Sequence, residues 1–233
     1  DLTTLQKEAN RKHGFSADKT LSLAQALYEK KIISYPRTGS RYISEDVFET
    51  IPTLLHQLGI TLSQPLNRHA VDDHRVTDHH ALLPTGESPE GLSPEETMLY
   101  QMILSRFIEA FAPNSEEERM QAELSDGTYR YSWRATHRLS LGWRAYSQDG
   151  GKDKAEATDD EEELLEQLPM LTEGEHLPLR HSEITEHQTK PKPLFTEASL
   201  LSAMEHAGRE LTDAESRKAI AECGLGTPAT RAS

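Results

Sequence analysis

The chain has 233 residues, with 25 Lys and Arg, 39 Asp and Glu, and a formal net charge of -14. No run of about 18 apolar residues occurs, which excludes a transmembrane helix of ordinary length. The single cysteine, Cys223, excludes a disulfide framework and favours a reducing compartment. The chain begins at Asp1 without a methionine, and we expect it to be a piece of a longer protein.

The acidic charge is concentrated in two segments. Residues 86–120 contain eight acidic and two basic residues, and residues 151–175 contain ten acidic and two basic residues. Residues 1–85 carry ten residues of each sign. The net charge argues against a nucleic-acid partner, but the balanced part of the chain could contact phosphates within the screening length of about 10 Å.

The first 118 residues are predicted to be mainly helical. Apolar periodicity and capping residues predict helices at 2–13, 17–30, 44–58 and 94–111. Thr3 or Thr4 is the expected N-cap of the first helix and Ser16 that of the second. Ser93 to Glu96 forms a capping box that includes a proline. Between the helices, residues 32–35 are a short strand-like stretch that Pro36 ends.

Residues 119–146 change to a β pattern. Ser125-Asp126-Gly127 predicts a hairpin turn. The return strand alternates, with Tyr129, Tyr131, Trp133 and Ala135 on one face and Arg130, Ser132, Arg134 and Arg138 on the other. Residues 142–146 are expected to continue in β structure, and residues 176–190 to form another strand. The acidic segment 147–167 is predicted to be a solvated, mobile loop.

The last forty residues return to a helical pattern. Thr196 is the expected N-cap of a helix over 197–207, which Gly208 ends. A second capping box at Thr212 begins a helix that ends at Gly224, and Thr227 begins a third helix.

The segment Tyr35-Pro36-Arg37-Thr38 places a tyrosine between a strand-like stretch and a proline-fixed turn. A tyrosine hydroxyl, with a pKa of about 10, is by itself a poor nucleophile at neutral pH. An arginine two residues later can stabilise charge that develops on a phosphate, so the pair suits covalent attack on a phosphodiester. The alternative is a tyrosine that packs at a strand end beside solvated arginines, and the residue types alone favour this alternative.

Residues 72–85 are dense in histidines and carboxylates, which serve as metal ligands or as acid–base groups. No pair has the H-x-x-x-H spacing of a helical zinc site and no CxxC motif is present, so a polar loop is favoured over a metal site. A histidine that contacts a phosphate or donates a proton is as well supported as one that only makes a hydrogen bond.

Three further features are candidates for binding sites. The glycine-containing segment 224–231 leads into a helix start, which is an anion site in many proteins, but it lacks the lysine of a P-loop. Arg130, Arg134 and Arg138 could follow a nucleic-acid backbone, although a solvent-facing sheet surface is commoner. The acidic run 159–163 is predicted to be a solvated loop rather than a metal site.

Taken in order, these segments resemble the type IA DNA topoisomerases. Tyr35-Pro36-Arg37-Thr38, followed by Ser40, resembles the active-site tyrosine motif of that family, and residues 77–85 resemble its histidine-containing segment. Residues 3–30 resemble the lead-in to the tyrosine, and residues 195–201 and 224–232 resemble later helical segments. The Tyr-Pro-Arg, Asp-His-His-Ala and Gly-Thr-Pro-Ala-Thr-Arg forms resemble the bacterial topoisomerase III branch.

The resemblance implies an α+β fold in three parts. These are a helical, winged-helix-like tyrosine domain (1–118), a β-rich antiparallel arch segment (119–190), and the start of a helical single-strand-binding domain (191–233). Tyr35 would attack a single-stranded phosphodiester and hold its 5′ phosphate, Arg37 would stabilise that phosphate, and His79 would support the phosphate or the proton transfers. The phosphotyrosine bond conserves the energy for resealing, so no ATP is required. The implied DNA contacts are Arg41, Ser199, Gly226, Thr227, Thr230 and Arg231.

Two features depart from the family pattern. Gly39 lies where the family commonly has aspartate, which puts any local role of that carboxylate in doubt. The Toprim domain, with its magnesium-binding acidic residues and catalytic glutamate, has no counterpart here, because no Asp-x-Asp-x-Glu motif occurs. We therefore expect Mg²⁺ to be bound outside these residues, no metal site within them, and no activity from this chain alone.

The expected partners are single-stranded DNA and the Toprim domain of the same parent chain, in a protein that is monomeric, cytoplasmic, nucleoid-associated and free of membrane contact. Two alternatives stay open. One is a non-catalytic single-strand-binding or clamp module that uses the same surfaces. The other is a metal-dependent phosphohydrolase built on His74, Asp78 and His79.

Overall fold

The computed structural model describes residues 1–76, 78–147, 163–207, 224–227 and 230–231. The chain divides into two compact units. The tyrosine unit comprises residues 1–114, 143–151 and 195–233, and the ribbon unit comprises residues 115–142 and 152–194. The tyrosine unit is helical and the ribbon unit holds a small sheet, so the α+β composition predicted from the sequence is confirmed.

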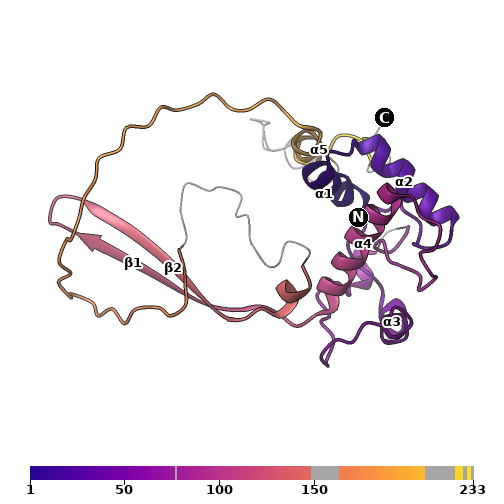
Figure 1. Cartoon of the computed structure of the whole chain (residues 1–233), viewed down its shortest axis with the longest axis horizontal. Helices are drawn as coiled ribbons and strands as arrows, with labels where there is room; N and C mark the ends of the chain where they lie inside the picture. The colour runs from indigo at the N-terminus through magenta and orange to yellow at the C-terminus, as the bar shows by residue number, and fades with distance from the viewer. Residues whose placement is uncertain (77, 148–162, 208–223, 228–229, 232–233) are drawn as a thin grey trace. The chain divides into compact units, whose positions relative to one another are not determined.

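Among the described residues, five α-helices form the frame of the tyrosine unit (Figure 1). They are α1 (Leu2–His13), α2 (Ala17–Glu29), α3 (Glu45–Gln57), α4 (Pro94–Phe111) and α5 (Glu197–Glu205). Each lies within two residues of its predicted range at both ends, since the N-caps Ser16, Ser44, Ser93 and Thr196 each accept a backbone N–H of the first turn. The prediction of Thr3 or Thr4 as the N-cap of α1 was wrong. Asp1 is the N-cap and accepts the Thr4 N–H, while Thr3 is buried within the helix.

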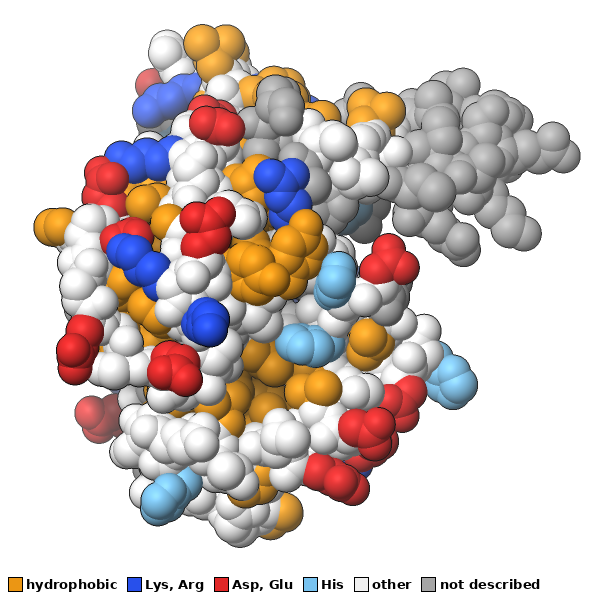
Figure 2. All heavy atoms as spheres, turned by 90° about the vertical axis from the view of Figure 1, so that its right-hand side faces the viewer, with side chains coloured by type: hydrophobic (Ala, Val, Ile, Leu, Met, Phe, Trp, Pro, Cys, Tyr) orange, Lys and Arg blue, Asp and Glu red, His pale blue; other side chains and the backbone are white. Residues whose placement is uncertain are grey.

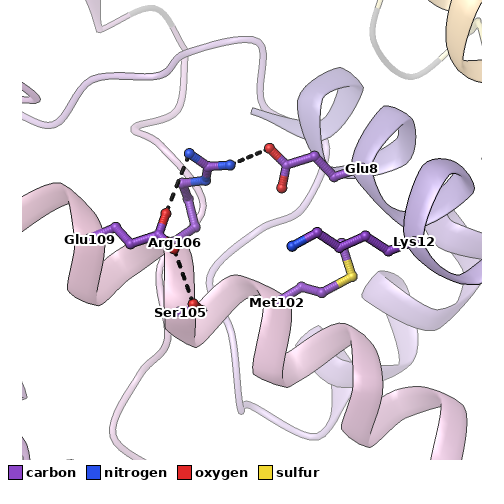
Figure 3. A pocket seen from close by; sticks show the side chains of 6 residues that line it. All are labelled: Glu8, Lys12, Met102, Ser105, Arg106 and Glu109. Atoms are coloured by element: carbon purple, nitrogen blue, oxygen red, sulfur yellow. Dashed lines mark hydrogen bonds and ion pairs between the residues drawn. The ribbon is translucent and has the colours of Figure 1, made fainter. Parts of the chain in front are cut away.

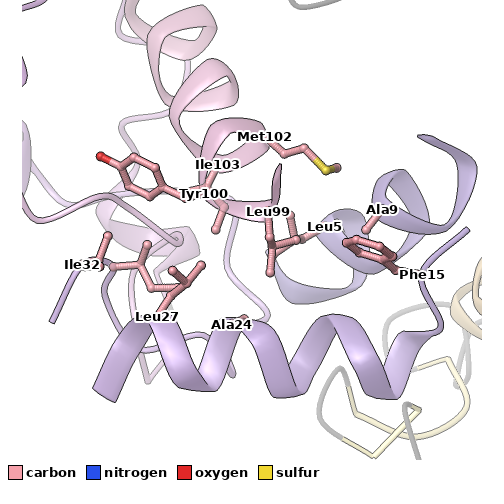
Figure 4. Close-up of a cluster of buried hydrophobic side chains, with 11 residues drawn as sticks. Leu5, Ala9, Phe15, Ala24, Leu27, Ile32, Leu99, Tyr100, Met102 and Ile103 are labelled. Atoms are coloured by element: carbon pink, nitrogen blue, oxygen red, sulfur yellow. The ribbon is translucent and has the colours of Figure 1, made fainter. Parts of the chain in front are cut away.

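Two apolar clusters make the core of this unit. The first joins α1, α2 and α4 beneath the chain that leads to Tyr35, and Figure 4 shows side chains of all three helices converging there. Its fully buried members include Ala24 and Leu27 of α2 and Leu99 of α4. The second cluster packs α3 against the C-terminal half of α4 around Phe107 and Phe111. Each Å² of apolar surface that these side chains bury contributes about 25 cal/mol to the stability of the fold, so the two clusters hold the helices together.

The end of α2 is tied to the start of α4. Lys30 Nζ donates to both carboxylate oxygens of Glu96, at 2.7 and 2.8 Å, and the Ser93 N–H donates to the same carboxylate at 2.7 Å. The Lys30 ammonium and the Ser93 N–H lower the pKa of Glu96 from its ordinary value, because both stabilise the ionised carboxylate. This contact fixes the point from which the chain enters the tyrosine loop.

Lys31 turns the chain out of α2 with a φ of 62°, in the left-handed region that favours glycine. Its N–H donates to the Tyr28 carbonyl at 2.8 Å, and the Ile32 N–H donates to the Leu27 carbonyl at 3.0 Å. The next residues form the predicted strand-like stretch as an isolated antiparallel bridge between Ile33 and Pro84. A side chain with a Cβ therefore occupies a strained position just before Tyr35.

Lys31→Gly is expected to raise the free energy of unfolding by about 0.5–1 kcal/mol, because glycine adopts a positive φ without the Cβ clash. Urea denaturation of the purified chain measures the change. Lys31→Ala is the matched control, since it removes the ammonium but keeps the Cβ, and it should give no gain. Equal stabilities of the glycine and alanine variants would contradict this account of the turn.

The ribbon unit contains β1 (Glu116–Ser125), β2 (Arg130–Ser140) and β3 (Glu163–Leu165) in the order β1-β2-β3. β1 and β2 are antiparallel, and β3 joins β2 in parallel. The predicted hairpin turn is confirmed, with Asp126 Oδ1 accepting the Thr128 and Tyr129 N–H groups at 2.8 and 2.7 Å. These backbone N–H groups lower the pKa of Asp126. The register pairs Leu124 with Tyr131 and puts both on one face of the hairpin.

Two β predictions were wrong. Residues Gly142–Tyr146 form a 3₁₀ turn rather than a strand, because Gly142 has a φ of 51° and the Trp143 N–H donates to the Pro113 carbonyl at 2.8 Å. Residues 176–190 form no strand. Their apolar side chains have no surface to cover, as Ile184 is 96% exposed.

The remaining expectations fall wholly or partly outside the described residues. In the predicted acidic loop 147–167, residues 148–162 lie outside them, and 163–165 is strand β3 instead of loop. The capping box at Thr212 lies outside them, as do residues 228–229 of the last expected helix. Among the described residues, no helix combines the length and apolarity needed to span a bilayer.

Candidate active site

Tyr35 lies at the end of the bridge that follows α2, between the buried residues Ile33 and Pro36 and half-buried itself. Two rings contact it. The His79 ring centroid is 4.7 Å from that of Tyr35 with the planes 53° apart, and the Tyr28 centroid is 5.4 Å away with the planes 76° apart. The fold thus brings together Tyr35 and His79, two of the three residues predicted to be catalytic, across 44 positions of sequence.

Hydrogen bonds join the tyrosine loop to the segment that carries His79. The buried Thr38 hydroxyl donates to the His79 carbonyl at 3.1 Å, and the Ser40 hydroxyl donates to the Arg75 carbonyl at 3.1 Å. On the other side of the tyrosine, the Ser34 N–H donates to the Leu83 carbonyl at 2.8 Å. Because these bonds flank Tyr35 on both sides in sequence, they fix how the tyrosine faces the histidine.

Thr38 belongs to the tyrosine motif, but the sequence does not predict the hydrogen bonds that its side chain makes. Its side chain is 2% exposed, and its hydroxyl also accepts the Ser40 N–H at 3.1 Å. We expect Thr38→Val to lower the free energy of unfolding by about 1–3 kcal/mol, because the buried Ser40 N–H and the partly buried His79 carbonyl both lose this hydroxyl as a partner.

Chemical denaturation of the purified chain tests this expectation, and Thr38→Ser, which keeps the hydroxyl, is the matched control. A valine variant as stable as the wild type, or a serine variant as unstable as the valine variant, would contradict the assigned role of the hydroxyl.

Arg37 follows Tyr35 by two residues and is exposed. No hydrogen bond or ion pair joins its guanidinium to another residue within the part of the chain that the structure describes. Arg41, four residues later, instead pairs with the Asp1 carboxylate. Of these two predicted phosphate contacts, Arg37 is thus the one with an unengaged charge beside the tyrosine.

The predicted DNA contacts near the C-terminus rest on α1. Lys7 Nζ of α1 pairs with Glu205 at the end of α5 at 2.6 Å, and Glu205 also faces Arg231 at 3.6 Å. The Arg231 side chain is only 6% exposed and donates to the Leu225 carbonyl at 2.8 Å. Arg231 therefore holds this segment against α1 and the end of α5 within the tyrosine unit.

The members of this C-terminal group differ in accessibility. Gly226, Thr227 and Thr230 are exposed, and the two threonine hydroxyls lie 3.0 Å apart. Ser199 is half-buried and completes the capping box of α5 with Thr196. No hydrogen bond or ring contact between described residues joins this group to Tyr35, so the structure assembles Tyr35 with His79 but not with these residues.

The dense polar segment around His74 does not assemble a metal site. Asp72 accepts the His74 N–H at 3.0 Å and pairs with Arg75, and Asp73 accepts the Glu45 N–H at 3.1 Å. Throughout the described ranges, no three His, Cys, Asp or Glu side chains gather where they could hold a metal ion.

A small polar pocket between α1 and α4 is separate from the tyrosine (Figure 3). Arg106 of α4 pairs with Glu8 of α1 and, at 3.5 Å, with Glu109. The Ser105 hydroxyl donates to Glu109 at 3.2 Å, while burial raises the pKa of that carboxyl. Its charges satisfy one another, so the pocket is a structural contact between two helices rather than part of the candidate site.

The face of the molecule drawn in Figure 2 carries no continuous basic patch. In the view of Figure 2, histidine side chains lie beside exposed hydrophobic ones, and acidic and basic side chains are interspersed around them. This face offers individual cations rather than a continuous basic patch to a polyanion, which agrees with the balanced charge of residues 1–85.

Comparison with known proteins identifies the family. The model of the DNA topoisomerase family matches residues 1–233. DNA topoisomerase 3 of Shouchella clausii is 35% identical over 250 residues, covering 100% of this chain and 33% of that protein. DNA topoisomerase 3 of Bacillus licheniformis is 38% identical over 254 residues, covering 100% of this chain and 34% of that protein.

A solved structure agrees with these relatives. Full-length topoisomerase I from Thermotoga maritima is similar with a TM-score of 0.61 and 25% identity, over 100% of this chain and 36% of that one. The chain thus spans about a third of the length of the curated relatives it matches. The resemblance drawn from the sequence motifs is confirmed: the chain belongs to the DNA topoisomerase family, in its type IA class and topoisomerase III branch.

Proposed function

We propose that this chain is the tyrosine-bearing part of an ATP-independent DNA topoisomerase that cuts one strand, passes another through the break and reseals it. The observation that carries the proposal is the placement of Tyr35, half-buried against the His79 ring and two residues from the unengaged Arg37. A nucleophile, a cation and an imidazole thus lie within one short loop and the segment bonded to it.

The proposed chemistry is a transesterification with the Tyr35 oxygen as nucleophile. A bond forms between that oxygen and the phosphorus of the 5′ phosphate, and the bond from phosphorus to the 3′ oxygen of the neighbouring nucleotide breaks. The phenol loses its proton, and the 3′ oxygen gains one. The reverse reaction restores the strand, so no external energy source is needed.

Arg37 and His79 act on the same phosphate in this proposal. The Arg37 guanidinium stabilises the charge that grows on the phosphate oxygens as phosphorus passes through its five-coordinate state. His79, held by the Thr38 hydroxyl at its carbonyl, supports the phosphate or a proton transfer at the reacting oxygens. Gly39 contributes no side chain to this loop.

We propose further that the tyrosine unit contains the winged-helix-like domain, that the ribbon unit belongs to the arch, and that residues 191–233 begin a single-strand-binding domain. Gly226, Thr227 and Thr230 would contact the DNA backbone, with Arg231 holding their segment in place. Arg41 and Ser199 would also contact the DNA backbone. In the structure, Arg41 pairs with Asp1 and Ser199 is hydrogen-bonded to Thr196. The protein would act as a monomer in the bacterial nucleoid.

In this proposal, magnesium is bound by residues outside this chain. The described carboxylates and imidazoles do not gather into a donor set for a metal ion. The acidic residues of a Toprim domain in the same parent protein would bind it.

Relaxation of negatively supercoiled plasmid tests the proposal. The full-length protein should relax the plasmid with magnesium, and residues 1–233 alone should not. This chain alone should still bind single-stranded DNA weakly, with an affinity that falls as salt rises, because phosphate contacts release counterions.

Two outcomes would contradict the proposal. Magnesium-dependent relaxation by residues 1–233 alone would show that every catalytic group lies within them. Single-strand binding without any cleavage by the full-length protein would favour a clamp module instead.

A further inference from the structure

Tyr28 is an aromatic side chain at the candidate site to which neither the sequence motifs nor the proposed chemistry gives a role. It lies in the last turn of α2, and its side chain is 39% exposed. Its ring meets that of Tyr35 nearly at right angles, with the centroids 5.4 Å apart. No hydrogen bond between described residues uses its hydroxyl. The ring, rather than the hydroxyl, is therefore the part of Tyr28 that acts on Tyr35.

The backbone beneath Tyr28 is anchored to the core of the tyrosine unit. The neighbouring residues Ala24 and Leu27 are fully buried in the first core cluster. The Tyr28 carbonyl accepts the Lys31 N–H at 2.8 Å, and Lys30 pairs with Glu96 of α4. Tyr28 thus projects from an end of α2 that is anchored to α4.

The backbone that carries Tyr35 has less regular secondary structure than the helix that carries Tyr28. It follows an isolated bridge rather than a full strand, and Arg37 beyond Pro36 is exposed. No hydrogen bond within the described residues holds the Tyr35 hydroxyl. Besides the hydrogen bonds that fix the backbone on both sides of Tyr35, the rings of Tyr28 and His79 pack directly against the Tyr35 ring.

We propose that Tyr28 is a positioning residue that limits the orientations of Tyr35 to those in which its oxygen reaches the phosphate. The inference rests on the proposed function, because it assigns Tyr28 through the nucleophile. An edge-to-face ring pair stabilises one orientation over others, and a reacting oxygen out of line by about 1 Å costs rate steeply. Replacing the ring with an aliphatic side chain should slow cleavage without weakening DNA binding.

The test uses the full-length protein and a single-stranded oligonucleotide. Single-turnover cleavage rate and Kd are measured for the wild type, Tyr28→Leu and Tyr28→Phe. Tyr28→Leu should cleave about two- to tenfold more slowly, with its Kd within about twofold of the wild type. Tyr28→Phe keeps the ring and should cleave at the wild-type rate.

Tyr146→Leu is the matched control. Tyr146 is 38% exposed, close to the 39% of Tyr28, and makes no ring contact with Tyr35. It should cleave at the wild-type rate. Tyr28→Met, a second aliphatic replacement without a ring, gives the same test should the leucine variant be too unstable to assay, with thermal unfolding as the check.

Three results would overturn the inference. They are wild-type cleavage by the leucine and methionine variants, equal losses of rate and affinity, and a phenylalanine variant as slow as the leucine variant. Cleavage by a Tyr35→Phe variant tests the proposed function separately from the role of Tyr28. Normal cleavage by that variant would remove the nucleophile assignment itself, whereas an inactive Tyr35→Phe beside a normal Tyr28→Leu overturns only the positioning role.

Discussion

Tyr35→Phe in the full-length protein is expected to lower the rate of DNA cleavage by about 10³-fold or more, because it removes the only atom that attacks the phosphate in our proposal. Its effect on folding should stay within about 0.5 kcal/mol, since no described residue is hydrogen-bonded to the hydroxyl and the ring is retained. Covalent adduct formation on single-stranded DNA, detected by denaturing electrophoresis, measures the first effect and thermal unfolding the second.

Tyr42→Phe provides the matched control for that variant. Tyr42 lies seven residues further along the same segment, and its hydroxyl accepts a hydrogen bond from Arg75 at 2.6 Å. Its loss should leave adduct formation intact. An adduct formed by Tyr35→Phe at the wild-type rate would contradict the assignment of Tyr35 as the nucleophile.

Arg37→Ala is expected to slow cleavage by about 10²-fold and to weaken single-strand binding by less than about threefold. The guanidinium has no partner among the described residues, so its charge is available to the phosphate. It stabilises most the state in which phosphate charge is greatest, and loss of one such donor costs about 10²–10³ in rate. The rate is read from single-turnover cleavage and the affinity from titration of the same oligonucleotide.

Arg41→Ala is the comparison that gives the Arg37 result its meaning. Arg41 is also exposed and lies four residues later, but it pairs with Asp1. We expect it to change cleavage and binding to the same small extent, as a backbone contact does. Equal losses of rate and affinity in Arg37→Ala would make Arg37 such a contact and remove its role in the reaction.

The helices and the hairpin were predictable because their signals are local. Ser16, Ser93 and Thr196 cap helices whose apolar residues recur at helical spacing, and Asp126-Gly127 supplies the turn chemistry of the hairpin. The 3₁₀ turn after Gly142 was not predictable, because its aromatic residues are equally common in strands and only tertiary packing of Trp143 decides the outcome.

The sequence motifs single out the proposed members of the candidate site, but they do not give its geometry. The tyrosine motif and the histidine segment identify Tyr35, Arg37 and His79, because each carries distinctive chemistry. The ring contacts of Tyr35 depend on how a loop after α2 meets a segment more than forty residues away, and no local pattern encodes that meeting. The low exposure of Arg231 likewise follows from its contacts with Leu225 and Glu205, which a sequence motif does not show.

The measurement that tests the central claim most directly is the identity of the atom joined to DNA. The full-length protein would be trapped on a single-stranded oligonucleotide by denaturant, digested with protease and nuclease, and analysed by mass spectrometry. Our account predicts a nucleotide on the peptide that contains Tyr35, joined through its 5′ phosphate, with a free 3′ hydroxyl on the released strand. A nucleotide on any other residue, or a link through a 3′ phosphate, would contradict it.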